Sequence, residues 1–305
     1  MQEEIAGNTL QVQSVIYENE KSHLLRSAES IFQAASYALD HRTFSRIALA
    51  YGDCSVQPVL APEDIEGMNA KFSGKMTVSY AFWGANLGTA KGHNTLARNC
   101  ESNYIIVENP DILMCYDTIS MLFEPFRVSP ATTGMSEAKQ IPIEHPKYYD
   151  PNTGETSWSS TACTMFPKHV FDLAGGFDSD SFFLYCDDVD FSWKVRLKGF
   201  KVIYQPCAAV FHNKTLSNEA KWQSTSAERY YSAEAGLLLA YKWSRKDLSD
   251  KILAFFKKSS EPYYVKAACE FERRRMEGRL PKQLDRHHKV AEFVDGNYGK
   301  MRFSL

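Results

Sequence analysis

The chain has 305 residues, of which 44% are apolar, and its formal net charge is −2. This length suits one large domain or a domain with an appendage, and the apolar share suffices for a substantial core, which excludes wholesale disorder. The mixed charges lack the basic face typical of nucleic-acid binding, and no apolar run reaches the ~18–20 residues that span a bilayer.

The seven cysteines form neither a CxxC pair nor an even set that would indicate a disulfide framework. The first residues show no signal-peptide pattern. We therefore expect reduced thiols and a cytoplasmic protein, soluble or at most peripheral at the inner face of the cell membrane.

In the first half of the chain, apolar runs typical of strands alternate with patterns typical of helices. This alternation predicts an α/β fold with a mostly parallel sheet flanked by helices. The expected order is strand 10–17, helix 21–39, strand 44–55, strand and loop 75–88, helix 94–102 and strand 104–111. Ligands of such sheets bind outside the carboxyl ends of the strands. Four polar segments occupy those ends: 17–19, 52–55, 86–94 and 109–111.

The second half is less regular. Residues 125–160 include "HPKYYDPNTGETSW", whose turn formers predict a surface loop or hairpin. A short helix should end at Gly175 and Gly176, and a strand is expected in "FKVIYQP", followed by "AAVFHNKT". From about residue 216 the pattern becomes that of amphipathic helices. We expect a sheet domain over 1–215 and a helical C-terminal region over 216–305.

The stretch "FFLYCDDVDFSWKVRLKGF", residues 182–200, sets three aspartates at the start of a predicted helix that ends at Gly199. Its apolar positions at i, i+4 and i+8 predict one buried stripe: Val189, Trp193 and Leu197. Helix capping by carboxylates is one explanation, but a single aspartate would satisfy it. Asp187, Asp188 and Asp190 crowd like charges together, which favours a cation, a hydrogen-bond donor or a proton-transfer task.

Three further segments have both a structural and a functional interpretation. "ENPD", residues 108–111, is an ordinary turn sequence, yet at a strand end Asp111 could bind a hard divalent cation. His212 after a strand is structural unless it converges with Asp111. "NLGTAKGHN", residues 86–94, is rich in glycine and opens a helix, an arrangement that lets backbone N–H groups approach phosphate.

Residues 175–212, "GGFDSDSFFLYCDDVDFSWKVRLKGFKVIYQPCAAVFH", resemble family 2 glycosyltransferases of the GT-A fold, and most closely the rhamnosyltransferase-like members that build bacterial surface polysaccharides. "NLGTAKGHN" resembles that family's glycine-containing segment, and "VENPD" resembles its variant of the metal-binding DXD motif. The likeness spans roughly residues 10–215. The fold it implies is GT-A, a Rossmann-like sheet flanked by helices.

The resemblance also implies roles for individual residues. Asp188 would be the general base, with Asp187 supporting it or orienting the acceptor. Asp111 and His212 would hold Mn²⁺ or Mg²⁺ against the diphosphate of the donor. The residues expected to bind the donor are Tyr17, Asn19, Asp53, Asn86, Gly88, Lys91, Asn94, Asn109 and Asp111. The chain departs from the family pattern at Gly52, where an aspartate is usual, and at the neutral Asn109.

These roles fit the chemistry of glycosyl transfer. A sugar hydroxyl has a pKa far above 7, so a carboxylate must take its proton as the glycosidic bond forms. The departing nucleoside diphosphate develops charge that a divalent metal offsets. Asp190 would cap the helix. We expect an inverting, metal-dependent transferase moving a sugar from a nucleotide donor, dTDP-rhamnose or a UDP-sugar, to a growing polysaccharide or a lipid-linked glycan.

Two alternatives remain open. A sugar nucleotidyltransferase shares this architecture, although its N-terminal phosphate loop is missing. A catalytically silent nucleotide-sugar-binding subunit of a glycan assembly complex would explain Gly52 and Asn109, but the Asp187–Asp188 pair opposes it. For the C-terminal helices, "KILAFFKK" and "ERRR" suggest a basic surface. The helices would pack on the sheet domain, contact an anionic membrane or form the interface of a homo-oligomer. No nucleic-acid partner is expected.

Overall fold

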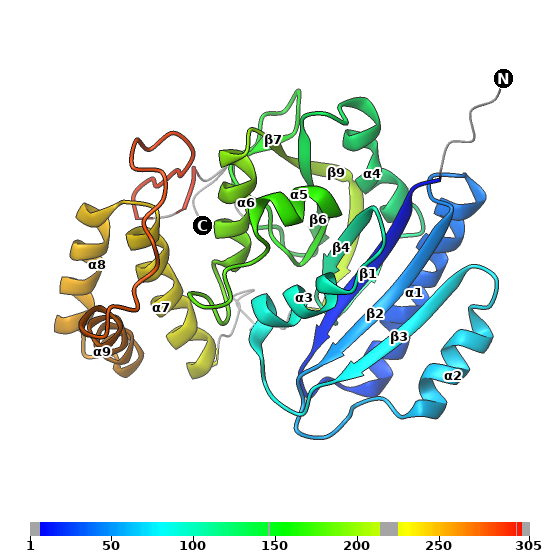
Figure 1. Ribbon diagram of the computed structural model, residues 1–305, viewed down its shortest axis with the longest axis horizontal. Helices are drawn as coiled ribbons and strands as arrows, with labels where there is room; N and C mark the ends of the chain where they lie inside the picture. Colours follow the sequence, from blue (N-terminus) through cyan, green and yellow to red (C-terminus); the bar gives the residue numbers. More distant parts are fainter. Residues whose placement is uncertain (1–6, 146, 214–224, 297, 301–305) are drawn as a thin grey trace.

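The computed structural model describes residues 7–145, 147–213, 225–296 and 298–300 (Figure 1). Strands and helices alternate in its first part, as predicted. Their bounds are β1 Thr9–Ile16, α1 Lys21–Asp40, β2 Arg46–Asp53, α2 Pro62–Lys71, β3 Met76–Phe82, α3 Gly88–Arg98 and β4 Tyr104–Glu108. α3 begins six residues before the predicted start of its helix at residue 94, because Gly88 opens it in a left-handed conformation with φ 74°.

The first four strands of the chain lie side by side in the sheet, in the order β3, β2, β1, β4, and all of them are parallel. α1 shows why the sequence folds this way: its small and aliphatic residues recur every three or four positions and form one buried face. They are Leu24, Ala28, Ile31, Ala35 and Ala38. Because crossover helices bury parallel strands on both faces, the carboxyl ends of these strands meet at one edge.

The second half completes the sheet with mixed strand directions. β8 pairs antiparallel with both β4 and β6, whereas β6 and β9 run parallel. The bounds are β5 Ile112–Met114, α4 Thr118–Val128, β6 Thr133–Ile141, β7 Glu155–Thr156, β8 Cys163–Pro167, α5 Lys168–Ala174, α6 Asp187–Leu197 and β9 Lys201–His212. α5 ends as predicted at Gly175, whose φ is 76°.

The prediction that 125–160 is a loop or hairpin was wrong for its first part. β6 lies inside the sheet and is buried along most of its length, although polar residues such as Ser136, Glu137 and Gln140 interrupt its apolar pattern. Those polar residues hid the strand, because a strand buried on both faces usually reads as a continuous apolar run. The two segments expected around 200–215 form one long strand, β9.

Helices cover both faces of the sheet. α1, α2 and α4 share one hydrophobic cluster with the strands, and α3, α5 and α6 share another on the opposite face. In α6, Val189 and Trp193 are buried as predicted, but Leu197 is 40% exposed, so the buried stripe stops one turn early.

The C-terminal region contains α7 Ser226–Lys242, α8 Lys246–Lys258 and α9 Pro262–Met276, followed by a non-helical segment through residue 300. The predicted boundary at 215/216 lies outside the described residues. The three helices pack beside α6, where Trp193 meets Trp243 edge to face at 5.2 Å (Figure 1).

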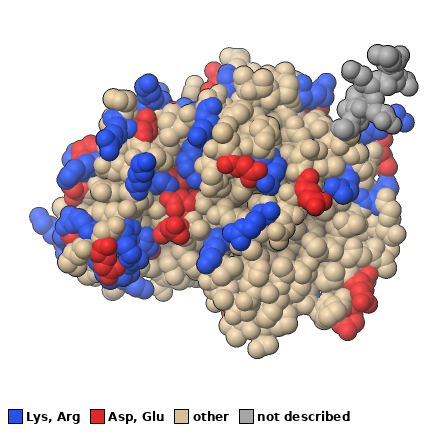
Figure 2. Space-filling model, viewed as in Figure 1, with Lys and Arg blue, Asp and Glu red and all other residues tan. Residues whose placement is uncertain are grey.

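The charges of these helices are largely paired. In Figure 2 their side of the molecule carries Lys and Arg next to Asp and Glu, while the area near the ends of β1–β3 is mostly uncharged. In α9, Arg273 contacts Glu270, Arg274 contacts Glu234 and Arg275 contacts Glu272. The "ERRR" run is therefore not an unneutralised basic surface.

Two chain-wide expectations can be compared with the structure. None of the described helices combines the length and the hydropathy needed to cross a membrane. All seven cysteines lie in the described part of the chain, and each is a free thiol, as expected for reduced cysteines.

Candidate active site

The start of α6 is built on a strained turn. Tyr185 and Cys186 both have left-handed backbone conformations, with φ of 68° and 56°. Non-glycine residues rarely adopt this conformation, and consecutive ones persist only where the surrounding structure holds them. The turn brings Asp187 and Asp188 to the first positions of the helix, where the free N–H groups and the helix dipole favour negative charge.

Asp187 is almost fully buried, with 5% of its surface exposed. Its Oδ2 accepts a hydrogen bond of 3.0 Å from the hydroxyl of Thr89, in the first turn of α3. Burial, and then the charge of Asp188, raise the pKa of Asp187 to about 7. The contact ties α6 to α3, which follows the carboxyl end of β3. Sequence reasoning missed Thr89, although it lies inside the segment "NLGTAKGHN".

Asp188 is partly exposed and lies in the field of a buried ion pair. Desolvation raises its pKa to about 6, while the positive charge of Lys147 lowers it and the negative charge of Glu137 raises it. Lys147 and Glu137 contact each other, and both are at least 95% buried. Because burial raises the pKa of both Asp187 and Asp188 toward neutrality, these carboxylates can accept a proton near neutral pH, which suits proton transfer.

Lys147 and Glu137 are functional candidates that the sequence did not reveal. Lys147 also donates to the carbonyl of Trp158 at 3.1 Å and lies 4.1 Å from the centre of its ring. Glu137 belongs to the unpredicted strand β6, and Lys147 lies in a segment that the pattern indicated as a surface loop. A lysine in a polar loop carries no signal of burial, so only the fold could find this pair.

Asp190 does not cap the helix as predicted. Its side chain is fully buried, forms an ion pair with Lys242 at 2.7 Å and accepts a hydrogen bond from the indole of Trp243 at 3.0 Å. Lys242 is also paired with Asp178 at 2.6 Å. Asp190 therefore joins α6 to the end of α7, and its role in the structure differs from that of its two neighbours.

A second polar group forms where β4 and β9 end. Oδ1 of Asp111 lies 3.3 Å from Nε2 of His212, and Nδ2 of Asn109 lies at the same distance from that nitrogen. Nδ1 of His212 is 2.8 Å from Oε1 of Gln140. Because an amide oxygen only accepts and an amide nitrogen only donates, Nδ1 donates to Gln140 and Nε2 accepts from Asn109. Gln140, another residue of β6, was also missed.

These residues suit a divalent cation that takes its remaining ligands from a bound substrate. With Nδ1 protonated, Asp111 and His212 direct two acceptors at each other, an arrangement that a cation between them would relieve. The described residues contain no group of three or more His, Cys, Asp or Glu side chains placed to hold a metal. A cation here would need oxygen ligands from elsewhere, as Mg²⁺ often takes them from substrate phosphates.

The two strand ends expected to contact the nucleotide differ in accessibility: Tyr17 is exposed, whereas Asp53 is buried. Tyr17 is 48% exposed after β1, and its N–H donates to Oδ1 of Asn19 at 2.9 Å. The carboxylate of Asp53 is buried instead and accepts from the N–H groups of Ser55 and Val59 at 2.8 and 2.9 Å.

Tyr80 also donates to Asp53. With its oxygens occupied, Asp53 shapes the loop after β2, and the expectation that it contacts the base directly is not supported by this geometry.

Gly52 is one of the two positions at which the chain departs from the family pattern. The indole of Trp83 fills the space that a side chain at this position would occupy. A Cβ built at Gly52 would lie 2.1 Å from Cη2 of Trp83. We expect Gly52→Ala to lower the free energy of unfolding by about 1–3 kcal/mol, because overpacking displaces the indole and the neighbouring strands. Urea unfolding followed by circular dichroism measures this.

Gly67→Ala is the matched control for Gly52→Ala. Gly67 lies inside α2, and an added Cβ there meets no atom within 4 Å. This change should be neutral or stabilising, since alanine favours helix more than glycine does. Equal stability of the two variants would contradict the packing role of Gly52.

The glycine-containing segment positions α3 rather than leaving its first amides open. Asn86 accepts from the N–H of Gly88 at 3.1 Å, and the N–H of Thr89 donates to the carbonyl of Phe183 at 3.2 Å. The amide group of Asn94 is engaged with both backbone groups of Phe177, so Asn94 joins α3 to the Gly-Gly-Phe turn and is not free for the donor. Lys91 is exposed.

Comparison with known proteins gives partial sequence matches and extensive structural ones. No family model matches the chain. It is 30% identical over 89 residues to N-acetylglucosaminyl-diphospho-decaprenol L-rhamnosyltransferases from two strains of Mycobacterium tuberculosis. That match covers 29% of this chain and only 26% of the length of each relative.

Several solved structures cover most of the chain. GalNAc-T7, solved with UDP, GalNAc and Mn²⁺, is 14% identical with a TM-score of 0.66, over 94% of this chain and 57% of that one. The mannosyltransferase PcManGT from Pyrobaculum calidifontis, with GDP-Man and Mn²⁺, is 15% identical with a TM-score of 0.54, over 89% and 83%. S. aureus TarS 1-349 with UDP-GlcNAc is 13% identical with a TM-score of 0.53, over 88% and 73%.

The chain has a GT-A glycosyltransferase fold. At these identities the structural matches show the fold alone, and they confirm the fold class that the sequence predicted. In this GT-A fold, Asp111 follows the carboxyl end of the parallel strand β4. The contact of Asp187 with Thr89 brings the start of α6 to the same edge, where ligands of such sheets bind.

Proposed function

We propose that the chain is an inverting, metal-dependent glycosyltransferase that uses a nucleotide-sugar donor. The observation that carries the proposal is the pairing of two sites by one strand: β6 supplies Glu137 to the surroundings of Asp188 and Gln140 to His212. One site suits a general base and the other a cation beside a diphosphate. The solved structures of the same fold that contain UDP, GDP-Man or UDP-GlcNAc support a nucleotide sugar as the donor class.

Asp188 would accept the proton of the attacking hydroxyl. Its pKa of about 6 leaves it mostly ionised at neutral pH yet basic enough to take a proton. Asp187, held by Thr89, would keep the pair oriented and stabilise the proton once it is transferred. A single carboxylate base and direct displacement by the acceptor imply inversion at the anomeric carbon, which NMR of the product can test.

Asp111 and His212 would hold Mn²⁺ or Mg²⁺, with Asn109 beside them. The ion would offset the charge that develops on the departing nucleoside diphosphate. Gln140 would accept the Nδ1–H of His212 and so hold Nε2 pointed at the site, as outer-shell partners of metal-binding histidines do. Exposed Tyr17 at the end of β1 and Lys91 in α3 would lie along the nucleotide.

Calorimetric titration of UDP and dTDP, with and without Mn²⁺, tests the metal and donor assignments. We expect binding of one nucleotide that depends on Mn²⁺ and is lost in Asp111→Ala. Gln140→Leu should weaken the metal-dependent binding by about 10–100-fold, because His212 loses its orienting partner. Asp188→Asn should bind as the wild type does. Failure of both nucleotides to bind under every metal condition would refute the transferase proposal.

The acceptor proposed is a growing polysaccharide or a lipid-linked glycan, a class supported by the mycobacterial relatives, which are named as rhamnosyltransferases of N-acetylglucosaminyl-diphospho-decaprenol. A silent nucleotide-sugar-binding subunit is the second candidate, because the neutral Asn109 stands beside His212 where a carboxylate would bind a cation more strongly. It predicts nucleotide binding without turnover, whereas the transferase predicts sugar transfer that requires Asp188.

A further inference from the structure

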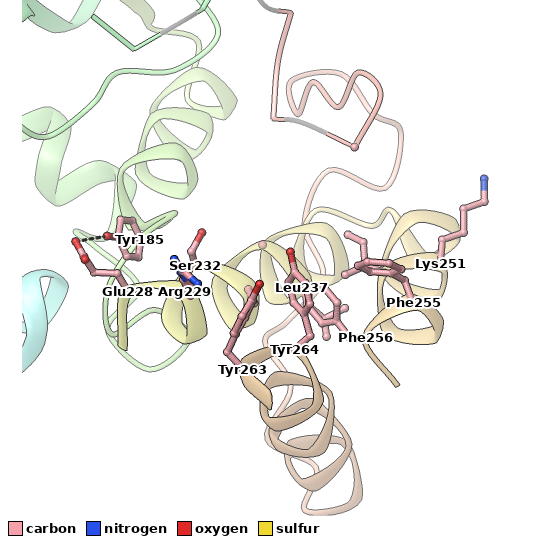
Figure 3. Close-up of a pocket in the computed structure, with 14 residues that line it drawn as sticks. Tyr185, Glu228, Arg229, Ser232, Leu237, Lys251, Phe255, Phe256, Tyr263 and Tyr264 are labelled. Atoms are coloured by element: carbon pink, nitrogen blue, oxygen red, sulfur yellow. Dashed lines mark hydrogen bonds between the residues drawn. The ribbon is translucent and has the colours of Figure 1, made fainter. Parts of the chain in front are cut away.

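A pocket of about 880 Å³ lies between α7, α8, α9 and the turn that precedes α6 (Figure 3). This volume is in the range of small-molecule sites. Tyr185, one of the residues that line the pocket, lies two residues before Asp187 in the chain. No residue of the proposed donor or metal site lines it.

The two ends of the pocket differ in chemistry. At the end near α6, the hydroxyl of Tyr185 donates to Glu228 at 3.1 Å, and Ser232 and Arg229 lie beside them (Figure 3). These groups can bind hydroxyls. This end is polar and includes Tyr185, the lining residue nearest in sequence to the aspartates.

At the opposite end the walls are aromatic. Phe256 stacks on Tyr264 with ring centres 4.4 Å apart, and Phe255 meets Tyr264 edge to face at 5.5 Å. Phe255 is nevertheless 59% exposed (Figure 3). A large aromatic side chain left in water inside a concave site favours an apolar ligand.

Gly236 supplies the third observation. It lies in the interior of α7, where glycine is less favourable than alanine. An added Cβ would meet no atom within 4 Å, and the residue does not have a positive φ. Neither close packing nor backbone conformation accounts for the glycine. Because Gly236 has no side chain, the pocket stays open at this position.

We propose that this pocket binds the acceptor and that the acceptor is an amphiphile. Its saccharide lies at the Tyr185 end, directed at Asp188, and its apolar part lies along Gly236, Phe255 and Phe256. This inference rests on the proposed function, since it names the acceptor class of that same active site. A free polysaccharide would gain little from the exposed aromatic end, whereas a hydrocarbon tail would bury it.

Two glucosides that differ only in their tails test the proposal: n-octyl β-D-glucopyranoside, below its critical micelle concentration, and methyl β-D-glucopyranoside. NMR titration should show the octyl compound binding the wild type at least about tenfold more tightly, because its methylenes are buried. Gly236→Ala should keep this difference. Gly236→Trp should abolish it by filling the pocket.

Equal affinities of the two glucosides for the wild type would overturn the proposal, as would an undiminished difference in Gly236→Trp. Nucleotide titration of the same samples judges the transferase proposal separately, because a pocket variant should bind UDP or dTDP as the wild type does. If Gly236→Trp does not fold, Phe255→Ser changes an exposed side chain and should reduce the octyl preference on its own; an unchanged preference there refutes the proposal.

Discussion

Replacing Asp188 with asparagine should lower kcat by about 10²–10⁴-fold, because the amide cannot accept a proton from the acceptor hydroxyl. Nucleotide binding should be unchanged, since Asp188 is not among the proposed donor ligands. Initial rates of nucleoside diphosphate release, measured with saturating donor, give the comparison. Asp172→Asn is the matched control, because Asp172 is exposed and paired with Lys168 on α5.

The pH dependence follows from the same carboxylate. Below a pKa of about 6, Asp188 is protonated and cannot act as a base, so kcat/KM of the wild type should fall as the pH drops through that value. An acid limb near the ordinary pKa of aspartate, or full activity of Asp188→Asn, would contradict the assignment of Asp188 as the general base.

The free energy of unfolding of the wild type should fall as the pH rises through about 6, the same range in which kcat/KM should rise. Because folding raises the pKa of Asp188 above its unfolded value, the ionised form is disfavoured in the folded state. The associated stability is present below the unfolded pKa and is lost as pH rises through about 6. Asp188→Asn removes this loss, so the variant should be more stable than the wild type at pH 8 and not at pH 4.

Local patterns were enough to predict the parallel half of the sheet. In α1 and in strands β1, β2 and β4, the apolar period and the tertiary burial agree, so the elements could be located to within a few residues. β6 could not be found this way. It is buried while carrying Ser136, Glu137 and Gln140. Glu137 is paired with Lys147 from the following loop and Gln140 with His212, 72 residues away, and neither partner can be inferred from the pattern of the strand.

The candidate site divides in the same way. Asp187, Asp188, Asp111 and His212 could be named because they stand in a recognisable order along the chain. Lys147 could not, since its burial depends on the pairing with Glu137 across a loop. A motif likewise does not reveal which of its members are already engaged: Asp53 lies in a predicted donor segment, yet its oxygens accept from Ser55 and from neighbours that only the fold supplies.

Asp190→Ala should lower the free energy of unfolding by about 3–5 kcal/mol, because it breaks a buried ion pair and leaves the indole N–H of Trp243 without its acceptor. Asp178 still neutralises Lys242, which places the expected value toward the lower end of this range. Urea unfolding at pH 7 is the measurement. The matched variant is Asp188→Ala, two residues away on the same helix.

Asp188→Ala should cost little stability or increase it, since the folded state disfavours that charge. Similar losses in the two variants would mean that the carboxylates share one structural role, such as capping. A large loss at Asp190 alone would show that the charge at the start of α6 is divided: Asp190 fastens the helix to α7 and leaves Asp187 and Asp188 free for chemistry. The turn at Tyr185 and Cys186 would then be held from α7, where Glu228 accepts from Tyr185. The stability lost at the catalytic pair would be offset at Asp190, two residues further along the helix.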